Sequence, residues 1–343
     1  MVKDFSGLTG HAAILSTGIG LGLACLAVGS AAAKPAYTTI DPPGSISTQA
    51  IGINDAGTIV GGYTPDGSTY LCFTRASDGT YSSFAVPNAD GSFCFAVNSK
   101  GTVLGYSDDT NGIAHGLVYS SGSITTFDVP GDAFGTYPTA INSKGVITGS
   151  WYDENVVAHG FIRAANGTIT SLDVSGSSST TCSAINDKGV IVGGYSVGNS
   201  YPHGFIRAAD GTITSFDPPG STATYAWSIN AKGEILGDYY TGTFSGFTRA
   251  TDGTFTTFTL RKTEFLFALS LDKAGAGAGY RIDTRGYDHG FALDPHDKAK
   301  SFDEPNAGGQ QSATVAFGMN NSGAMVGYYV DSSNVTHGFL RTP

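Results

Sequence analysis

Residues 183–221 read SAINDKGVIVGGYSVGNSYPHGFIRAADGTITSFDPPGS and contain four short apolar runs, each ended by turn-forming residues. The first run ends at the turn Asn-Asp-Lys-Gly that starts at Asn186, and the second, Val190–Tyr195, is rich in β-branched residues. The third, His203–Ala208, ends at Asp-Gly, and the fourth, Thr212–Asp217, ends at Pro-Pro-Gly. Runs of this kind predict strands joined by hairpins. We call them strands a, b, c and d of one four-stranded antiparallel sheet.

The same pattern recurs along the chain. The residue that starts the turn between strands a and b falls at Asn54, Asn98, Asn142, Asn186, Asn230, Asp272 and Asn320. The intervals between these positions are 44, 44, 44, 44, 42 and 48 residues. A fixed period near 44 with four strands per period predicts an all-β fold, a seven-bladed β-propeller of four-stranded antiparallel blades. We number the repeats 1 to 7 in this order.

The two ends of the repeat array are incomplete in complementary ways. Repeat 7 has strands a, b and c but stops at Pro343, whereas Tyr37–Gly44 matches the strand-d segment Thr214–Gly220. We therefore expect the N-terminal strand to complete the last blade and close the ring, which removes an exposed sheet edge. The predicted organisation is a signal peptide over residues 1–33 and a single propeller domain over residues 34–343.

The first 33 residues have the three parts of a secretory signal peptide. These are Lys3, an apolar run over residues 12–28, and small residues up to Ala33. A single membrane anchor is the alternative, but the run is short and rich in Gly, Ala and Ser. We expect a secreted or periplasmic bacterial protein, a monomer with no membrane span in the mature chain. The net charge of −10 argues against nucleic acid as a partner.

The repeat resembles that of the HAF-repeat family of extracellular bacterial proteins. The pattern I-N-x-x-G-x-I-x-G-x-Y stands at Ile185–Tyr195, H-G-F at His203–Phe205 and T-x-F-D-x-P-G at Thr214–Gly220. The match covers residues 37–341. The resemblance implies export from a bacterial cell and a repeat-built β fold, and it supplies no catalytic residues.

Residues that recur at one position in every repeat are interpreted as scaffold. The turn Asn can bond the backbone two residues on. The His of H-G-F recurs in five repeats, on outer strands too far apart to share one metal ion, so we expect it to bond a neighbouring loop. The Asp that ends strand d is expected to cap its turn. We predict no metal and no cofactor.

Three cysteines remain after removal of the expected signal peptide, namely Cys72, Cys94 and Cys182. Cys72 and Cys94 lie in neighbouring repeats, and a disulfide between them is possible. We favour the alternative, in which they are small buried thiols.

Departures from the repeat pattern mark the candidate site. In a propeller the d–a and b–c loops open on one face, which we call the loop face, and such loops carry binding residues. Repeat 6 places two cations on its d–a loop and two on its b–c side, with acidic and Tyr residues among them. The alternative is that the Arg and Asp residues of this repeat pair with each other. Aromatic residues stand near the mouth in other repeats and can stack on sugar rings, but for them we favour packing between blades. The candidate ligand-binding residues are Arg261, Lys262, Arg281, Asp283, Arg285, Tyr287, Asp288, Tyr137, Trp151 and Tyr225.

Three functions remain open, and the catalytic residues are unknown. The favoured one is a non-enzymatic binding module for a glycan or a protein at the loop face, because no catalytic motif is present and Arg forks suit carboxylate or phosphate. The second is a carbohydrate-active enzyme near repeat 6. It would be a lyase using Arg281, Arg285 and Tyr287, or a hydrolase using two carboxylates. The carboxylates available to it are Asp283, Asp288, Asp153 and Glu154. The third is a structural envelope protein.

Overall fold

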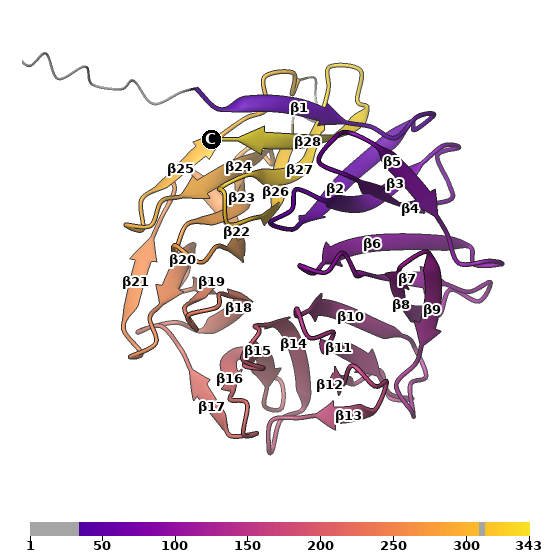
Figure 1. Cartoon of the computed structure of the whole chain (residues 1–343). Helices are drawn as coiled ribbons and strands as arrows, with labels where there is room; N and C mark the ends of the chain where they lie inside the picture. The colour runs from indigo at the N-terminus through magenta and orange to yellow at the C-terminus, as the bar shows by residue number, and fades with distance from the viewer. Residues whose placement is uncertain (1–33, 309–312) are drawn as a thin grey trace, which may run out of the picture. The chain divides into compact units, whose positions relative to one another are not determined.

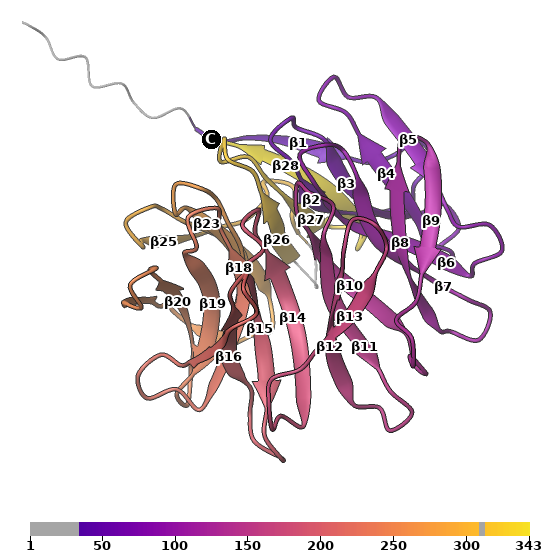
Figure 2. The same cartoon turned by 60° about the horizontal axis from the view of Figure 1, so that its bottom comes forward.

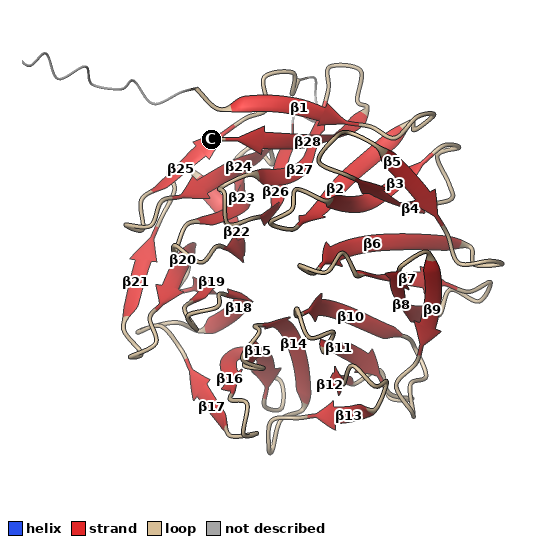
Figure 3. Ribbon diagram, in the orientation of Figure 1, coloured by secondary structure: helices blue, strands red, loops and turns tan. Residues whose placement is uncertain are grey.

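The computed structural model describes residues 34–308 and 313–343, so the expected signal peptide, residues 1–33, lies outside the described residues. The described residues form 28 strands and no helix (Figure 3). Pro35–Pro343 forms one compact unit. Within the described ranges, no helix is long and apolar enough to cross a membrane.

Repeats 1 to 5 each form a separate four-stranded sheet in the order a-b-c-d, with antiparallel neighbours throughout. Repeat 1 comprises β2 (Ser47–Ile53), β3 (Ile59–Thr64), β4 (Leu71–Arg75) and β5 (Tyr81–Phe84). Repeat 2 comprises β6 (Gly91–Val97), β7 (Val103–Asp108), β8 (Ala114–Ser120) and β9 (Ser123–Phe127). Repeat 3 comprises β10 (Thr136–Ile141), β11 (Ile147–Tyr152), β12 (Ala158–Arg163) and β13 (Ile169–Leu172). Repeat 4 comprises β14 (Ser179–Ile185), β15 (Ile191–Ser196), β16 (His203–Arg207) and β17 (Ile213–Phe216). Repeat 5 comprises β18 (Ala223–Ile229), β19 (Ile235–Tyr240), β20 (Phe244–Arg249) and β21 (Phe255–Phe258). The prediction of an all-β chain is confirmed, and that of separate four-stranded antiparallel sheets is confirmed for these five repeats.

The other eight strands form one sheet, in which a single parallel pair, Asp288 with Ala313, joins two antiparallel runs. The first run is repeat 6, with β22 (Thr263–Leu271), β23 (Gly277–Asp283), β24 (Asp288–Leu293) and β25 (Ala299–Phe302). The second is repeat 7, with β26 (Ala313–Met319), β27 (Met325–Val330) and β28 (Thr336–Thr342). The N-terminal strand β1 (Ala36–Ile40) pairs antiparallel with β28, from Ala36 opposite Thr342 to Ile40 opposite Gly338. It takes the place of a strand d.

The sheets follow one another around a common centre, with strand d on the outside (Figure 1). Strand a of each repeat contacts strand a of the next, and β26 contacts β2. The turned view shows the strands running between two faces that carry the connecting loops (Figure 2). The loop face therefore combines segments from consecutive repeats.

Each sheet is built around one buried aromatic or aliphatic side chain on strand c and a glycine on strand b. Phe205 is fully buried and lies over Gly193. A methyl group at Gly193 would lie 2.0 Å from the Thr181 carbonyl oxygen and 2.9 Å from the Phe205 ring. Strand a bulges beside this point, between Cys182 and Ala184. The recurring glycine of strand b is thus required by the close approach of its two neighbours.

A chain of side-chain hydrogen bonds links the turns between strands a and b. In repeat 3, Asn142 Oδ1 accepts the N–H groups of Lys144 and Val146, and its Nδ2 donates to the carbonyl oxygen of Asn186 in the next repeat. The same bond, between 3.0 and 3.2 Å, leaves every turn Asn and includes one from Asn320 to Asn54. In repeat 6 the turn residue is Asp272, whose carboxylate has no N–H to donate to repeat 7. The sequence predicted the bond within each turn but not the bond between turns.

We expect Asp272→Asn to supply this donor and to raise the free energy of unfolding by about 1 kcal/mol, the usual net value of a hydrogen bond. The matched variant Asn142→Asp removes the donor in repeat 3 and keeps the acceptor, so it should lower stability by about 1–2 kcal/mol. Urea denaturation of both variants beside the wild type measures the two effects. Equal stabilities in all three proteins would contradict a role for these bonds in joining the repeats.

The recurring His and the recurring Asp bond each other. His203 Nδ1 lies 2.8 Å from the carboxylate of Asp217, at the end of strand d of the same repeat. The equivalent pairs, at 2.7–3.1 Å, are His115–Asp128, His159–Asp173, His289–Asp303 and His337–Asp41. In repeat 7 the Asp comes from the N-terminal segment, as its strand d does. The expected bond from His to a loop is therefore present. The Asp that we expected to cap the turn after strand d bonds this His instead.

The pair in repeat 2 gives a pH prediction, because the hydrogen bond to Asp128 raises the pKa of His115. A His with a raised folded-state pKa stabilises the fold fully below its unfolded-state pKa, about 6.5, and loses this effect as the pH rises through the folded-state pKa. We therefore expect His115→Gln to destabilise the protein more at pH 6 than at pH 9. Urea denaturation at both pH values measures this, with the exposed His296→Gln as control. A loss that does not depend on pH would contradict the prediction.

The structure corrects one expectation about the cysteines. Cys72 on β4 and Cys94 on β6 form a disulfide that joins repeats 1 and 2, with the Cα atoms 5.3 Å apart. They had been expected as unbonded thiols, but neighbouring repeats bring their Cα atoms within bonding range. Cys182 is a buried free thiol, and burial raises its pKa to about 12, so it is unreactive.

Candidate functional site

The exposed apolar side chains gather on the loop face. Within the described ranges, the large hydrophobic residues with high exposure lie on d–a or b–c segments, except Phe265, which stands near the start of β22. They are Ile46, Phe134, Val156, Val197, Tyr201 and Phe265. Tyr201 is 68% exposed and Phe265 is 39% exposed. Apolar side chains held in water on one face indicate an interaction surface.

Two adjoining cavities open on this face, between repeats 4 and 6. The first, of about 290 Å³, lies between repeats 4 and 5 and is lined by Tyr225, Trp227, Tyr195 and the hydroxyl residues Thr181 and Ser183, among others. Tyr225 and Trp227 stand two residues apart on β18, so their rings lie on the same side of the strand. The two ring planes are within 7° of parallel, with centroids 6.1 Å apart.

The second cavity, of about 490 Å³, lies between repeats 5 and 6 and shares Tyr225 with the first. Its other aromatic residues are Tyr201, Tyr240, Phe244 and Phe265. The rings of the last three form a contiguous wall, with centroids 5.0 Å apart for Tyr240–Phe244 and 5.3 Å apart for Phe244–Phe265. We call the two cavities together the Tyr225 groove.

A buried carboxyl lies behind the groove. Asp238, on β19, is only 1% exposed. One of its oxygens accepts the indole N–H of Trp227 at 2.5 Å and the backbone N–H of Ala268 at 3.4 Å. Burial raises the pKa of Asp238 to about 8, so the group is mostly protonated and uncharged at neutral pH. Sequence reasoning missed Asp238 and Trp227, although Asp238 stands where repeats 1 and 4 have Gly62 and Gly194.

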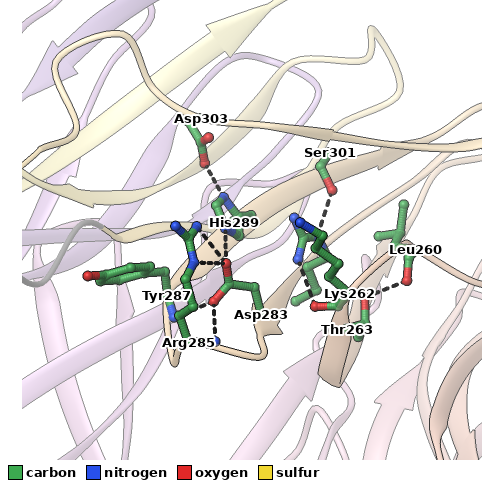
Figure 4. A network of polar contacts seen from close by, with 10 residues as sticks. Leu260, Lys262, Thr263, Asp283, Arg285, Tyr287, His289, Ser301 and Asp303 are labelled. Carbon is green, nitrogen blue, oxygen red and sulfur yellow. Dashed lines mark hydrogen bonds and ion pairs between the residues drawn. The ribbon is translucent and has the colours of Figure 1, made fainter.

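The structure places two of the four predicted cations of repeat 6, Arg285 and Arg281, in two separate bonded groups (Figure 4). In the first, the Arg285 side chain donates two hydrogen bonds, of 3.0 and 2.8 Å, to the buried carboxylate of Asp283. His289 Nε2 lies 3.4 Å from the same oxygen of Asp283. Burial alone would raise the pKa of Asp283, but the bonds from Arg285 and the Tyr287 backbone hold it well below its usual range. The Arg285 guanidinium also lies over the Tyr287 ring, 4.9 Å from its centroid.

In the second group, Arg281 Nε donates to Ser301 Oγ at 2.9 Å, and its guanidinium lies 3.5 Å from the Lys262 carbonyl oxygen. In repeat 4 the Tyr195 hydroxyl makes the equivalent contact with Ser215, at 2.8 Å. Arg281 thus takes over the bond that Tyr195 makes in repeat 4. The d–a and b–c segments of repeat 6 are neighbours, as expected, and the side chains of Arg261 and Lys262 are exposed.

The remaining predicted residues lie apart from these groups. Trp151 stacks on His159, its partner across the sheet, with centroids 4.6 Å apart. Tyr137 packs between Tyr106 and Tyr152. Asp288 is half-buried, and burial raises its pKa. Of the ten candidates, only Tyr225 lines the groove.

The geometry limits the chemistry that repeat 6 can perform. A general acid needs a carboxyl that stays protonated near neutral pH, but the pKa values of Asp283 and Asp153 are both lowered by hydrogen bonds that offset their burial. A lyase needs Arg side chains free to meet a substrate carboxylate, and Arg285 is bound to Asp283. Among the described residues, no group of three or more His, Cys, Asp or Glu could hold a metal ion.

Comparisons with known proteins support the fold. No known protein family and no curated protein matches the sequence. Similar solved structures include virginiamycin B lyase from Staphylococcus aureus, with a TM-score of 0.58 and 12% identity over 90% of this chain and all of that one. A prolyl endopeptidase gives a TM-score of 0.61 and 12% identity over 88% of this chain and 51% of its own. The β-propeller domain of the Trilobed protease from Pyrococcus furiosus gives 0.57 and 9% identity over 86% of this chain and 95% of that one. At these identities the likeness shows a β-propeller-type fold and nothing of the activity.

Proposed function

We propose that this chain is an exported, non-enzymatic binding module that holds a glycan or protein ligand on its loop face, over repeats 4 to 6. The observation that carries the proposal is the Tyr225 groove. It is concave, lined by aromatic and hydroxyl side chains, and lies on the face where the exposed apolar residues gather. Concave sites with aromatic walls and a few polar groups are typical of ligand binding.

We also propose that the seven repeats form a closed seven-bladed propeller. The pairing of β1 with β28 supports closure, as does the hydrogen bond from Asn320 to Asn54. The eight-stranded sheet divides into two blades if its single parallel pair is treated as a contact between neighbours. The recurring I-N, H-G-F and F-D motifs support a place among HAF-repeat proteins.

Export rests on two observations. Residues 1–33 have the composition of a signal peptide. The Cys72–Cys94 disulfide is typical of the periplasm or the cell exterior, because thiols stay reduced in the cytosol. We propose that the exported chain, residues 34–343, is a single domain that acts as a monomer.

A carbohydrate-active enzyme is the second candidate, and one observation favours it. Burial raises the pKa of Asp288. Burial also raises the pKa values of Tyr280 and Tyr328 to about 12, and the nearby charge of Asp288 adds to this rise. A half-buried carboxyl of this kind suits a general acid. Asp283 is a poor second carboxylate for such an enzyme, because it is bonded to Arg285.

The test titrates the purified protein with soluble neutral and acidic polysaccharides and follows bound ligand and new reducing ends in the same samples. We expect saturable binding without new ends. Tyr201→Ala/Phe265→Ala should weaken it at least tenfold, because it removes two exposed walls of the groove.

The matched control is Ile46→Ala/Val156→Ala, which removes exposed apolar side chains of the same face outside repeats 4 to 6 and should leave binding unchanged. Equal loss in both double variants would place the ligand elsewhere on the face. New reducing ends that vanish in Asp288→Asn would make the protein an enzyme and reject the binding module.

A further inference from the structure

The groove contains aromatic faces and hydroxyl groups but almost no charge. The residues that line the first cavity carry none, and those of the second include one ionisable acid, Glu264. The Asp238 carboxyl behind them is mostly neutral at pH 7. No Lys or Arg lines either cavity among the described residues. An acidic chain would therefore find no counter-charge there, and like charges in contact oppose binding.

The groove is also elongated. Two cavities of about 290 and 490 Å³ meet at Tyr225, and each is near or within the size range of a small-molecule site, about 300–1,000 Å³. Their aromatic residues run from Trp227 through Tyr225 to Phe244 and Phe265. This succession of rings suits a chain with repeated flat apolar faces, and sugar rings carry hydroxyl groups at their edges that Thr181 and Ser183 can bond.

The orientation of the Trp227 ring is fixed by a hydrogen bond to Asp238. The single polar atom of the ring, the indole nitrogen, donates to the buried carboxyl of Asp238, so the ring cannot turn without breaking this hydrogen bond. Tyr225 lies nearly parallel to it on the same strand. The Asp238 carboxyl is too buried to touch a ligand and acts only through Trp227.

We infer that the ligand of the Tyr225 groove is an uncharged glycan chain of several sugar units, stacked on Trp227 and Tyr225, and that Asp238 is the positioning residue for Trp227. This inference rests on the proposed binding function and names its ligand. It also replaces the acidic ligand that the cations of repeat 6 had suggested. Arg281 and Arg285 are bonded to other residues of repeat 6, and none of the four cations lines the groove.

The chain offers a direct spectroscopic test, because it has only two Trp residues. In a Trp151→Phe background, Trp227 is the sole tryptophan and its emission reports on the groove. The probes are neutral β-1,4- and α-1,4-linked glucose oligomers and a mannose oligomer. We expect at least one of them to shift this emission saturably and to bind more tightly as its chain lengthens. Oligogalacturonate of equal length should give no shift.

Two variants separate the role of Asp238 from general stability. Asp238→Asn keeps an oxygen acceptor for the indole N–H and should bind within about threefold of the parent. Asp238→Ala removes the acceptor and should weaken binding at least tenfold, as should Trp227→Ala, measured by calorimetry. Circular dichroism should show that the variants stay folded. If Asp238→Ala does not fold, Asp238→Asn alone still tests the positioning role. Weak binding by the folded Asn variant would contradict that role.

Each remaining outcome is decisive. Failure of every neutral oligomer to bind would overturn the inference, as would an acidic oligomer that binds equally well. If an acidic oligomer or a protein binds and Tyr201→Ala/Phe265→Ala abolishes that binding, the proposed binding module stands although the inference fails. If the bound ligand is unaffected by every groove variant, both fail.

Discussion

The hydrogen bond from each turn Asn to the backbone of the next repeat is the interaction on which the rest of the structure depends. One amide group closes its own turn through Oδ1 and fixes the neighbouring sheet through Nδ2, as Asn142 does for Asn186. These side chains are buried, so their bonds are made away from competing water. Because these bonds orient every sheet except that of repeat 7 on the one before it, a 44-residue spacing places equivalent loops side by side on the opposite face.

That opposite face is held by a second set of contacts, the His–Asp pairs between strand c and the end of strand d. With the turns fixed at one end and these pairs at the other, most positions of a repeat are committed to the scaffold. The remaining positions can vary between repeats without changing the fold, and they include Asp238, Trp227 and Tyr201. The Tyr225 groove is made of such positions, whereas Arg281 continues a scaffold bond made by Tyr195 in repeat 4.

The sequence predicted what depends on spacing and turn chemistry, and missed what depends on distance across strands. The period and the turn residues predict where the strands lie. They also predict that Tyr37–Gly44 matches a strand d. The Cys72–Cys94 bond depends on how two repeats meet, which a repeat pattern does not show. For repeat 6 the sequence left two alternatives, a cationic binding site and pairing of its Arg and Asp residues, because a list of charges does not show that Arg285 bonds Asp283. Asp238 was overlooked because alternation along a strand indicates which side a residue faces, not how deeply it lies.

Asp238 itself argues for the groove as the functional part of the molecule. Its neutral state at pH 7 is enforced by burial, and a carboxyl held neutral above its ordinary pKa lowers stability relative to an uncharged residue. Repeats 1 and 4 fill the same position with Gly62 and Gly194, so the strand does not require an acid. Residues that break a local rule at a cost in stability are typical of functional sites. Among the residues that the structure describes, the only side chain bonded to this carboxyl is that of Trp227, which lines the cavity. The cost is therefore explained if the orientation of that ring matters to a ligand.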